Sequence, residues 1–391
     1  MRRATCLVAL LAVTACSEPL ELADWLLEVP EGTPTRNYAH VPREERDPEA
    51  ITLVEDLLVG ADLSDPEAGV FDPSRIVASP AGSIFVSDVA MNHIQMYGPD
   101  GEYLKTLGRE GQGPGEFQWL WGMTIAGDHL VVDDRGNNRF SMWTLAGEHV
   151  EDHAKPSRLV HSSMEGLNDG TFVSRFRRQT MEDGRLVVAR QSLDGRELLR
   201  FADFDIGPSV RPEPDWDAYD MMRARVGLYE QPQAILTVGG GETVYLSPAR
   251  EYQVLALSMD GTALWALRTD MRRPPFPQAV KEAELERVTE GAVGISINDV
   301  DWPESYRSVQ YLRIDGAGRL YVFLEPGLPF PERPEVWEVD VYSPLGERLA
   351  AGFLPEVWSY ARGDHVFGIR TDPETEERVA VRYRLSVSGT R

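Results

Sequence analysis

Paired acidic and amide side chains recur at two matching places in the chain and could bind a cation. Asp88 and Asn92 follow one hydrophobic run, and Asp134 and Asn138 occupy the same positions after the next run. Carboxylate and amide oxygens are the ligands that Ca²⁺ prefers. Short polar side chains also brace turns through local hydrogen bonds. The sequence leaves both roles open.

A second acidic group lies in the stretch EPDWDAYD. Asp215 and Asp217 alternate there with Trp216 and Tyr219. Aromatic faces beside carboxylates suit a sugar or a cationic ligand. A solvated acidic loop with two packing aromatic rings has the same composition, so ligand binding is one of two alternatives.

The residue types that usually carry catalysis form no recognisable set. The seven histidines give neither H-x-H nor H-E-x-x-H, and His149 and His153, four apart, lie in a strand-and-turn pattern. The G-x-S-x-G motif is absent from the sequence. Of the two cysteines, Cys6 lies in the leader and Cys16 at its end, so the mature chain has no thiol nucleophile. We expect no catalytic residues and no resident cofactor, with Ca²⁺ or Zn²⁺ as the alternative.

Four glycines crowd the stretch LGREGQGPGEFQW at residues 107–119. A phosphate-binding loop of the Walker type requires Lys-Ser or Lys-Thr and then a helix. Neither follows here, because MTIAGDHLVVDD has the pattern of a strand and a turn. The stretch is therefore predicted to connect two pieces of sheet.

The N-terminus has the features of an export signal. Arg2 and Arg3 precede a short apolar run, Thr5–Ala12, which ends in Val13-Thr14-Ala15-Cys16. The last four residues resemble a bacterial lipobox, which implies a signal peptide over residues 1–15 and a lipid on Cys16. By the same resemblance, Ser17 implies sorting to the outer membrane. Ordinary secretory cleavage is the alternative.

Charge limits the choice of partner. The 391-residue chain has a formal net charge of −24 and a sequence pI near 4.7. Nucleic acids are bound through clustered Lys and Arg, so a nucleic-acid partner is excluded. The composition suits a globular protein with an acidic, solvated surface.

Short strand-like runs repeat along most of the chain. Each is preceded by a turn rich in Gly or Asp, and the spacing is that of propeller blades with two long insertions. The central residues of the six runs are Phe85, Val131, Phe172, Tyr245, Tyr321 and Phe367. At the positions of Asp88 and Asp134, the other four units carry Arg175, Pro248, Leu324 and Arg370, which excludes a ring of six identical ligands.

Five units also contain a tight hairpin between a third and a fourth strand, as in GPDGEYL and SLDGREL. The sixth unit ends after its third strand, Arg378–Val387, and the run at residues 50–60 can supply the missing one. We therefore predict an all-β fold: a six-bladed β-propeller over residues 50–391, closed by an N-terminal strand. Residues 16–49 are expected to form a tether with a short helix at Leu20–Leu27.

Blades 1 and 2 carry a specific resemblance. FVSDVAMNHIQMYGPDG, the glycine stretch and VVDDRGNNRFSMWTLAG are similar to the NHL-repeat propellers. The whole chain resembles bacterial six-bladed lipoproteins of that group. In that family the Asp and Asn residues mostly brace loops.

The long connections of such a propeller share one face, and the tight turns share the other. The long set includes residues 107–121, 207–233 and 268–308, the last with a helix predicted at Gln278–Thr289. Binding residues gather on long loops over rigid scaffolds. We expect the tether to leave from the tight-turn face and the helix to cap the channel mouth or dock a partner.

The expected function is that of an envelope-anchored, monomeric binding or scaffold lipoprotein, whose partner is a protein, peptide or glycan. Propellers in related families include enzymes, so the alternative is a metal-dependent lactonase-like hydrolase or a lyase similar to peptidyl-hydroxyglycine lyases. Its ligands would be drawn from Asp88, Asp134 and Asp315, although Asp315 is expected on the opposite face. Fold alone does not decide between the two.

Overall fold

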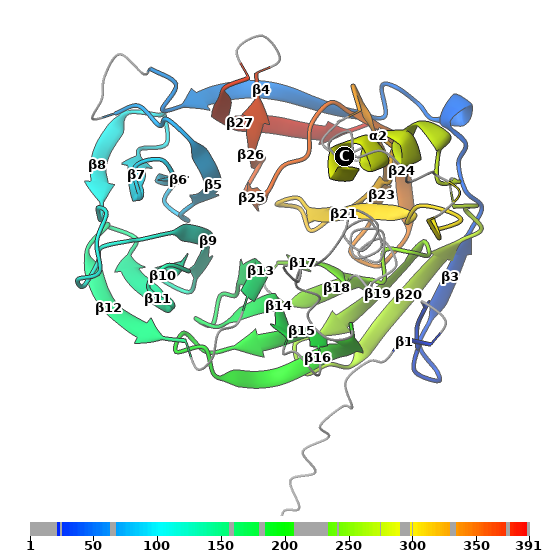
Figure 1. The fold of residues 1–391 in the computed structure, drawn as a ribbon, viewed down its shortest axis with the longest axis horizontal. Helices are drawn as coiled ribbons and strands as arrows, with labels where there is room; N and C mark the ends of the chain where they lie inside the picture. Colours follow the sequence, from blue (N-terminus) through cyan, green and yellow to red (C-terminus); the bar gives the residue numbers. More distant parts are fainter. Residues whose placement is uncertain are drawn as a thin grey trace, which may run out of the picture.

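Six β-sheets stand like blades around a central axis in the computed structural model of the chain (Figure 1). This confirms the predicted all-β, six-bladed propeller. No helix among the described residues is both long and hydrophobic enough to pass through a bilayer. The structure describes residues 22–23, 26–62, 68–155, 160–179, 184–206, 234–240, 242–273, 275–289, 298, 300–328, 334–372 and 376–388.

In each of the first three blades, four consecutive strands pair antiparallel. Blade 1 contains β5 (Pro73–Ala78), β6 (Ile84–Asp88), β7 (His93–Tyr97) and β8 (Tyr103–Leu107). Blade 2 contains β9 (Leu120–Ala126), β10 (His129–Asp134), β11 (Arg139–Thr144) and β12 (His149–Ala154). Blade 3 contains β13 (Val160–Gly166), β14 (Phe172–Gln179), β15 (Gly184–Gln191) and β16 (Glu197–Asp205).

The other three blades follow the same order, and two of them recruit an N-terminal strand. Blade 4 contains β17 (Ile235–Gly239), β18 (Thr243–Ser247), β19 (Gln253–Ser258), β20 (Ala263–Thr269) and, parallel to β20, β3 (Thr35–Tyr38). Blade 5 contains β21 (Val309–Ile314), β22 (Leu320–Leu324), β23 (Trp337–Tyr342) and β24 (Arg348–Leu354). Blade 6 contains β25 (Tyr360–Arg362), β26 (His365–Thr371), β27 (Arg378–Val387) and β4 (Ile51–Val59).

The sixth blade closes the ring as predicted. Strand β4 pairs antiparallel with β27 from Ile51–Val387 to Val59–Ala380. Arg382 on β27 donates to Asp56 on β4 at 2.6 Å, which adds a charged contact to the ladder. Blade 6, the last blade in the sequence, is thus completed by a strand from near the N-terminus of the chain.

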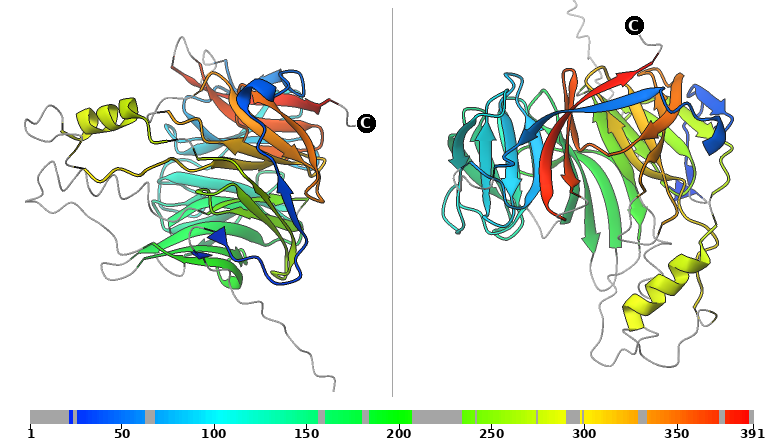
Figure 2. Two further views of the ribbon diagram at one scale, coloured as in Figure 1. Left: turned by 90° about the vertical axis from the view of Figure 1, so that its right-hand side faces the viewer. Right: turned by 90° about the horizontal axis from the view of Figure 1, so that it is seen from above.

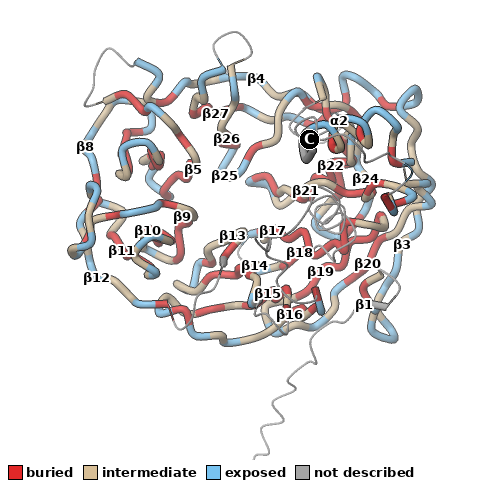
Figure 3. The backbone as a smooth tube through the Cα atoms, in the orientation of Figure 1, coloured by how far each residue is buried: buried red, intermediate tan, exposed pale blue. Residues whose placement is uncertain are grey.

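The repeat found in the sequence marks the second strand of every blade. These central strands are apolar because both of their faces are covered: all five residues of β6 and of β22 are buried. The outer strand β8 instead alternates, as expected of a strand with one solvated face. Figure 3 shows this change from buried inner strands to exposed outer ones.

The two faces of the disc differ. One, the hairpin face, carries the turns between first and second and between third and fourth strands. The other, the loop face, carries the remaining connections, including the helix α2 (Gln278–Thr289), which projects from it (Figure 2). The predicted helix has the expected bounds, but Val280 packs on Phe276 and Tyr306 of its own connection. Among the described residues that line the axial cavities, none belongs to α2.

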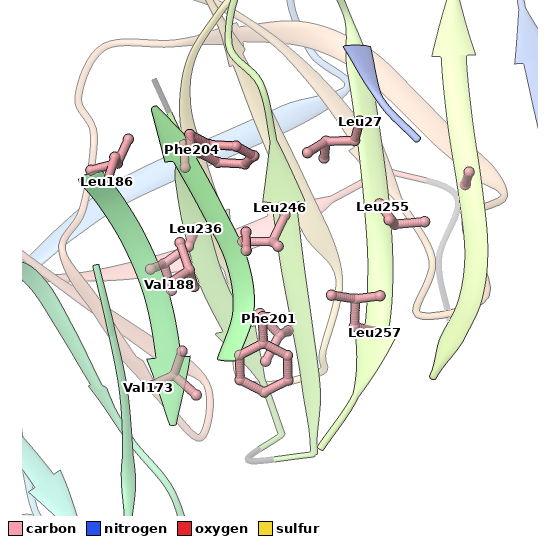
Figure 4. Close-up of a cluster of buried hydrophobic side chains, with 14 of the residues drawn as sticks. Leu27, Val173, Leu186, Val188, Phe201, Phe204, Leu236, Leu246, Leu255 and Leu257 are labelled. Carbon is pink, nitrogen blue, oxygen red and sulfur yellow. The ribbon is translucent and has the colours of Figure 1, made fainter. Parts of the chain in front are cut away.

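The segment expected to be a tether packs on the rim over much of its length. The predicted helix at Leu20–Leu27 is wrong, since β1 (Leu22–Ala23) and β2 (Leu26–Leu27) form a small antiparallel pair. Leu27 is buried in one cluster with Phe204 and Leu255 between blades 3 and 4 (Figure 4). Farther along, Tyr38 donates to the carbonyl of Gly346 at 2.8 Å.

The segment joins β4 at the hairpin face, as predicted, where Ile51 pairs with Val387, but at Leu27 it lies near the loop face. Residues 16–21 lie outside the described residues, so the face from which the lipid tether leaves stays a prediction. Leu27 belongs to the same buried cluster as Ile206 and Ala234, which flank the 207–233 insertion of the loop face. Its backbone N–H donates to Gln253 at the loop-face end of β19. The sequence indicated where β4 begins, but not that earlier residues fill the gaps between blades. We call residues 26–50 the strap.

Arg46 fixes the strap to blade 5. It follows the 3-10 helix η1 (Arg43–Glu45), and its fully buried side chain lies 2.8 Å from Asp340, itself buried. The other carboxylate oxygen of Asp340 accepts a hydrogen bond from Tyr252 at 2.7 Å. Nearby, Arg43 pairs with Glu338 at 2.7 Å, but its side chain is 61% exposed.

Substituting Arg46 and Arg43 in turn compares the contribution of a buried ion pair to stability with that of an exposed one. Arg46→Met should lower the free energy of unfolding by about 3–5 kcal/mol, because Asp340 is left charged and buried. Arg43→Met should lower it by no more than about 1 kcal/mol. Denaturant unfolding measures both, and equal losses would contradict an anchoring role for Arg46.

Candidate functional site

The first strand of each blade faces the axis, and side chains from all six blades line two adjoining cavities there. The cavity toward the loop face has a volume of about 330 Å³, and the one toward the hairpin face about 350 Å³. They share Thr124, Glu165, Arg313, Ser359 and Tyr360, which therefore lie at the waist between them. A ligand entering from the loop face reaches the first cavity before the waist.

Arginine dominates the first cavity. Arg75 from β5, Arg175 from β14, Arg313 from β21 and Arg307 just before β21 contribute to its lining. Glu165 from β13 is the single carboxylate among the described lining residues. In a chain with a net charge of −24, this is a local reversal of sign.

Three of these guanidinium groups have no acidic partner. Arg307 lies 3.3 Å from Glu325, whereas Arg75, Arg175 and Arg313 have no carboxylate within 4.0 Å in the part of the chain that the structure describes. Unpaired guanidiniums in a cavity favour binding of an anion, because the anion supplies both the charge and the acceptor oxygens.

Backbone carbonyls and one hydroxyl hold the three arginines in place. Arg175 donates to the carbonyl of Ala234 at 2.5 Å and to the hydroxyl of Ser162 at 2.8 Å. Arg313 donates to the carbonyls of Trp358 and Leu312, and Arg75 to that of Ser74 at 2.8 Å. Each guanidinium keeps further N–H groups for a ligand, and their orientation is fixed before the ligand arrives.

The electrostatics of the cavity reflect this crowding of cations. Burial, together with Arg177, Arg307 and Arg313, lowers the pKa of Arg175 to about 10. Burial raises the pKa of Glu165 to about 7, although the charges of Arg313 and Arg75 act in the opposite direction. Repulsion among the arginines is a cost that a bound anion would relieve.

The rest of the wall mixes aromatic and apolar side chains with neutral polar ones, among them Ser163 and Gln310. Trp121, Met123, Met164, Tyr311 and Tyr360 line the first cavity beside the arginines. Trp121 is held firmly, since its indole N–H donates to the carbonyl of His161 at 2.7 Å and the guanidinium of Arg135 stacks 3.7 Å from its ring centre. Such a wall suits a ligand with an acidic group and an apolar body.

The sequence matches no protein-family model and no curated protein sequence. The fold, however, recurs among solved structures. A Bacteroides fragilis protein described as exported has a TM-score of 0.53 at 10% identity, over 90% of this chain and 99% of that one. A member of the DUF4221 family from Bacteroides vulgatus also has a TM-score of 0.53 at 10% identity, over 88% and 100%.

Virginiamycin B lyase of Staphylococcus aureus is less similar, with a TM-score of 0.42 at 11% identity over 86% of this chain and 99% of that one. The two Bacteroides structures agree with the six-bladed propeller fold and, at their identities, establish nothing beyond it. The NHL-repeat and lipoprotein resemblances stay predictions.

The predicted pair in blade 1 braces a loop. The buried Asp88 carboxylate accepts backbone N–H groups of Phe71, Asp72, Ala90 and Met91. Asn92 adopts a left-handed backbone with φ of 50°, which Asn tolerates better than most residues. With four donors already bound, Asp88 has little capacity left for a cation.

Blade 2 repeats the arrangement. Asp134 accepts the backbone N–H groups of Gln118, Trp119 and Asn137, and the Asn137 side-chain amide at 2.6 Å. Asn138 has φ of 52°. The bracing role left open by the sequence is therefore the one that the geometry favours for both pairs.

The acids considered for a metal site are not brought together. Asp315 lies in the β21–β22 turn on the hairpin face, where it accepts N–H groups of Ala317 and Arg319 and the hydroxyl of Tyr321. Asp88 and Asp134 lie at the opposite face. Within the described ranges, no group of three or more His, Cys, Asp or Glu is placed to hold a metal ion. Cys16, Asp215, Trp216, Asp217 and Tyr219 lie outside the described residues.

The glycine stretch connects β8 to β9, as predicted. Arg139 donates to the carbonyls of Gly113 and Glu116 at 2.7 and 2.6 Å, so the loop is held by blade 2. Gly108 has φ of 73°, and a Cβ there would lie 2.3 Å from the ring of Phe117. Glycine is therefore required at this position by the backbone conformation of the connection.

Sequence reasoning missed the arginine cluster. Arg175 attracted notice only as a break in the Asp pattern, and Arg75, Arg313 and Glu165 lie in runs that read as ordinary strands. For Arg75, Arg313 and Glu165 the available signal was a charged residue within the first strand of a blade, which faces the axis. Arg175 lies on a second strand and carried no such signal.

The pKa of Glu165 gives the cavity a pH signature. Because its pKa is raised from 4.5 to about 7, the folded protein holds a proton that the unfolded chain releases across this interval. The stabilisation is complete below the lower value and is lost as the pH rises through the higher one. The free energy of unfolding of the wild type should therefore fall relative to Glu165→Gln across that interval.

Denaturant unfolding at several pH values measures this difference. Glu335→Gln, at an exposed surface position, is the matched control. Parallel pH profiles for the wild type and Glu165→Gln would show that Glu165 does not titrate in this range.

Proposed function

We propose that this chain is a binding protein of the cell envelope whose axial cavity takes an anionic ligand from the loop face. One observation carries the proposal: in an acidic protein, Arg75, Arg175 and Arg313 converge on a cavity without carboxylate partners in the part of the chain that the structure describes. An arginine kept only for stability is usually paired or spread over the surface.

The dimensions of the cavity support a small ligand or the acidic end of a larger one. Its volume of about 330 Å³ falls in the range of small-molecule sites, roughly 300–1,000 Å³. The 207–233 and 268–308 insertions both begin or end beside lining residues, at Ile235 and Arg307. A peptide or glycan held by these loops could place an acidic group in the cavity.

The metal-dependent alternative receives less support. Asp88, Asp134 and Asp315 are engaged in local hydrogen bonds at two opposite faces. The axial lining offers guanidinium groups, which repel a cation and supply no lone pairs for it. Binding of an anion fits the same residues directly.

Location in the envelope rests on the N-terminal motif. A signal over residues 1–15 and a lipid on Cys16 would anchor the propeller to a membrane, and Ser17 favours the outer one. The recurrence of the fold in a B. fragilis protein described as exported agrees with this part of the proposal.

Loss of one arginine should weaken anion binding. In calorimetric titrations with isophthalate and with phenyl phosphate, Arg175→Gln and Arg313→Gln should each weaken binding about 10–100-fold, the value of one or two charge-assisted hydrogen bonds. Arg185→Gln is the matched control, because Arg185 lies in the same blade as Arg175 but pairs with Asp203 at 2.7 Å.

Two results would overturn the anion site. Either the wild type binds neither probe, or Arg185→Gln weakens binding as much as the cavity variants do. Equal melting temperatures of the variants would show that altered binding does not reflect unfolding.

The anchor has its own test. Cys16→Ser should move the full-length protein from the membrane fraction to the soluble fraction of an expressing bacterium, because a thioether lipid cannot form on serine. Immunoblotting of the fractions measures the change. A membrane-bound Cys16→Ser protein would show that another feature holds it there.

A further inference from the structure

The number of charges in the first cavity indicates how many negative charges its ligand carries. This inference rests on the proposed anion site. Among the described residues, Arg75, Arg175 and Arg313 have no carboxylate partner, whereas Arg307 is offset by Glu325 at 3.3 Å. Against the three stands one carboxylate, Glu165. With Glu165 ionised, two positive charges in the lining remain uncompensated, and with Glu165 protonated all three do, so the excess is at least two in either state. A monoanion would leave one of them without a partner in a partly desolvated site.

The three guanidiniums approach the axis from different sides. Arg175 reaches from blade 3 to the carbonyl of Ala234 at the start of blade 4. Arg313 reaches from blade 5 to the carbonyl of Trp358 beside blade 6. Arg75 belongs to blade 1 and is held by its neighbour Ser74. The carbonyls therefore hold the three cations on different sides of the axis, so a ligand with several acidic oxygens can contact more than one of them.

Glu165 shares the waist with Arg313 and faces Arg75. Tyr360 from blade 6 also acts on this region, since burial and the nearby Glu165 both raise its pKa. Further charged or titratable residues of the first cavity are Arg175 on β14, Arg307 before β21 and His161 on β13, and Asp315 and Arg362 belong to the second. Strands β9 and β17 contribute no titratable side chain to the described lining. An anion bound beside Glu165 favours its protonated form, because two negative charges in one cavity repel.

We infer that the axial cavity is built for a dianion with an apolar body, and that Glu165 takes up a proton when this ligand binds. The two charges are either on separate carboxylates or shared by the oxygens of one phosphate group. Trp121, Met123 and Tyr311 supply the surface for the body that carries them.

Matched ligands test the charge requirement on the full chain. Isophthalate and 3-carbamoylbenzoate have nearly the same shape but differ by one charge. Phenyl phosphate and its methyl ester make the same comparison on a single group. In calorimetry near pH 7.5, at least one dianion should bind about tenfold or more tightly than its monoanionic partner, as expected for an added charge contact. Arg313→Gln should reduce that preference.

Proton uptake is read separately from affinity. Titrations in two buffers with different ionisation enthalpies should show a proton taken up per dianion bound near pH 7.5, and Glu165→Gln should abolish it. The affinity of the wild type should fall as the pH rises above 7, and that of Glu165→Gln should fall less.

The possible outcomes distinguish failure of the dianion inference from failure of the proposed anion-binding function. If the monoanions bind as tightly as the dianions, and Arg175→Gln weakens both, the anion site stands and the dianion inference is wrong. If a dianion is preferred but no proton is taken up, the role of Glu165 is wrong. If none of the four probes binds to the wild type, the proposed function and the inference fall together.

Discussion

The ladder between β4 and β27 is the constraint on which the rest of the molecule depends. Without it, blade 6 would have three strands and the ring an open edge. Closure holds the six blades around one axis, so Arg75 and Arg313 on first strands and Arg175 on the second strand of blade 3 cannot move apart to relieve their repulsion. A cluster of like charges on a flexible loop would spread into solvent. On this ring the arginines stay close together, and their mutual repulsion is relieved only when an anion binds between them.

Individual hydrogen bonds and packing contacts also hold the loops and the rim of the propeller rigid. Asp88 and Asp134 each gather several donors and fix the entry to blades 1 and 2, while Arg139 holds the glycine loop. On the rim, Leu27 and Arg46 tie the strap to blades 3, 4 and 5. The bracing residues lie around the cavity without lining it, so the scaffold and the site use different side chains and could change independently.

The propeller could be predicted from the sequence because each of its strands and turns is marked by neighbouring residues. Phe85, Tyr245 and Tyr321 each sit in an apolar run beside a glycine turn, and the missing strand of blade 6 follows from counting. The strap could not be predicted, since Leu27 and Arg46 are recognisable as packing residues only when blades 3 to 5 stand beside them. The cavity was hidden for the same reason: Arg75 and Arg313 meet only after the ring has closed. Asp88 and Asp134 were the visible candidates because their spacing repeats.

The sign reversal between surface and cavity has a kinetic consequence. A dianion approaching a protein of net charge −24 meets a repulsive far field, and it feels the arginines only near the mouth. Salt screens the long-range repulsion more than the short-range attraction inside the cavity, since the Debye length is roughly 8 Å at physiological ionic strength. Association should therefore become faster with moderate salt, the reverse of ordinary electrostatic steering. The acidic exterior would slow the approach of anions, a dianion more than a monoanion, and the cavity alone would decide which of them stays.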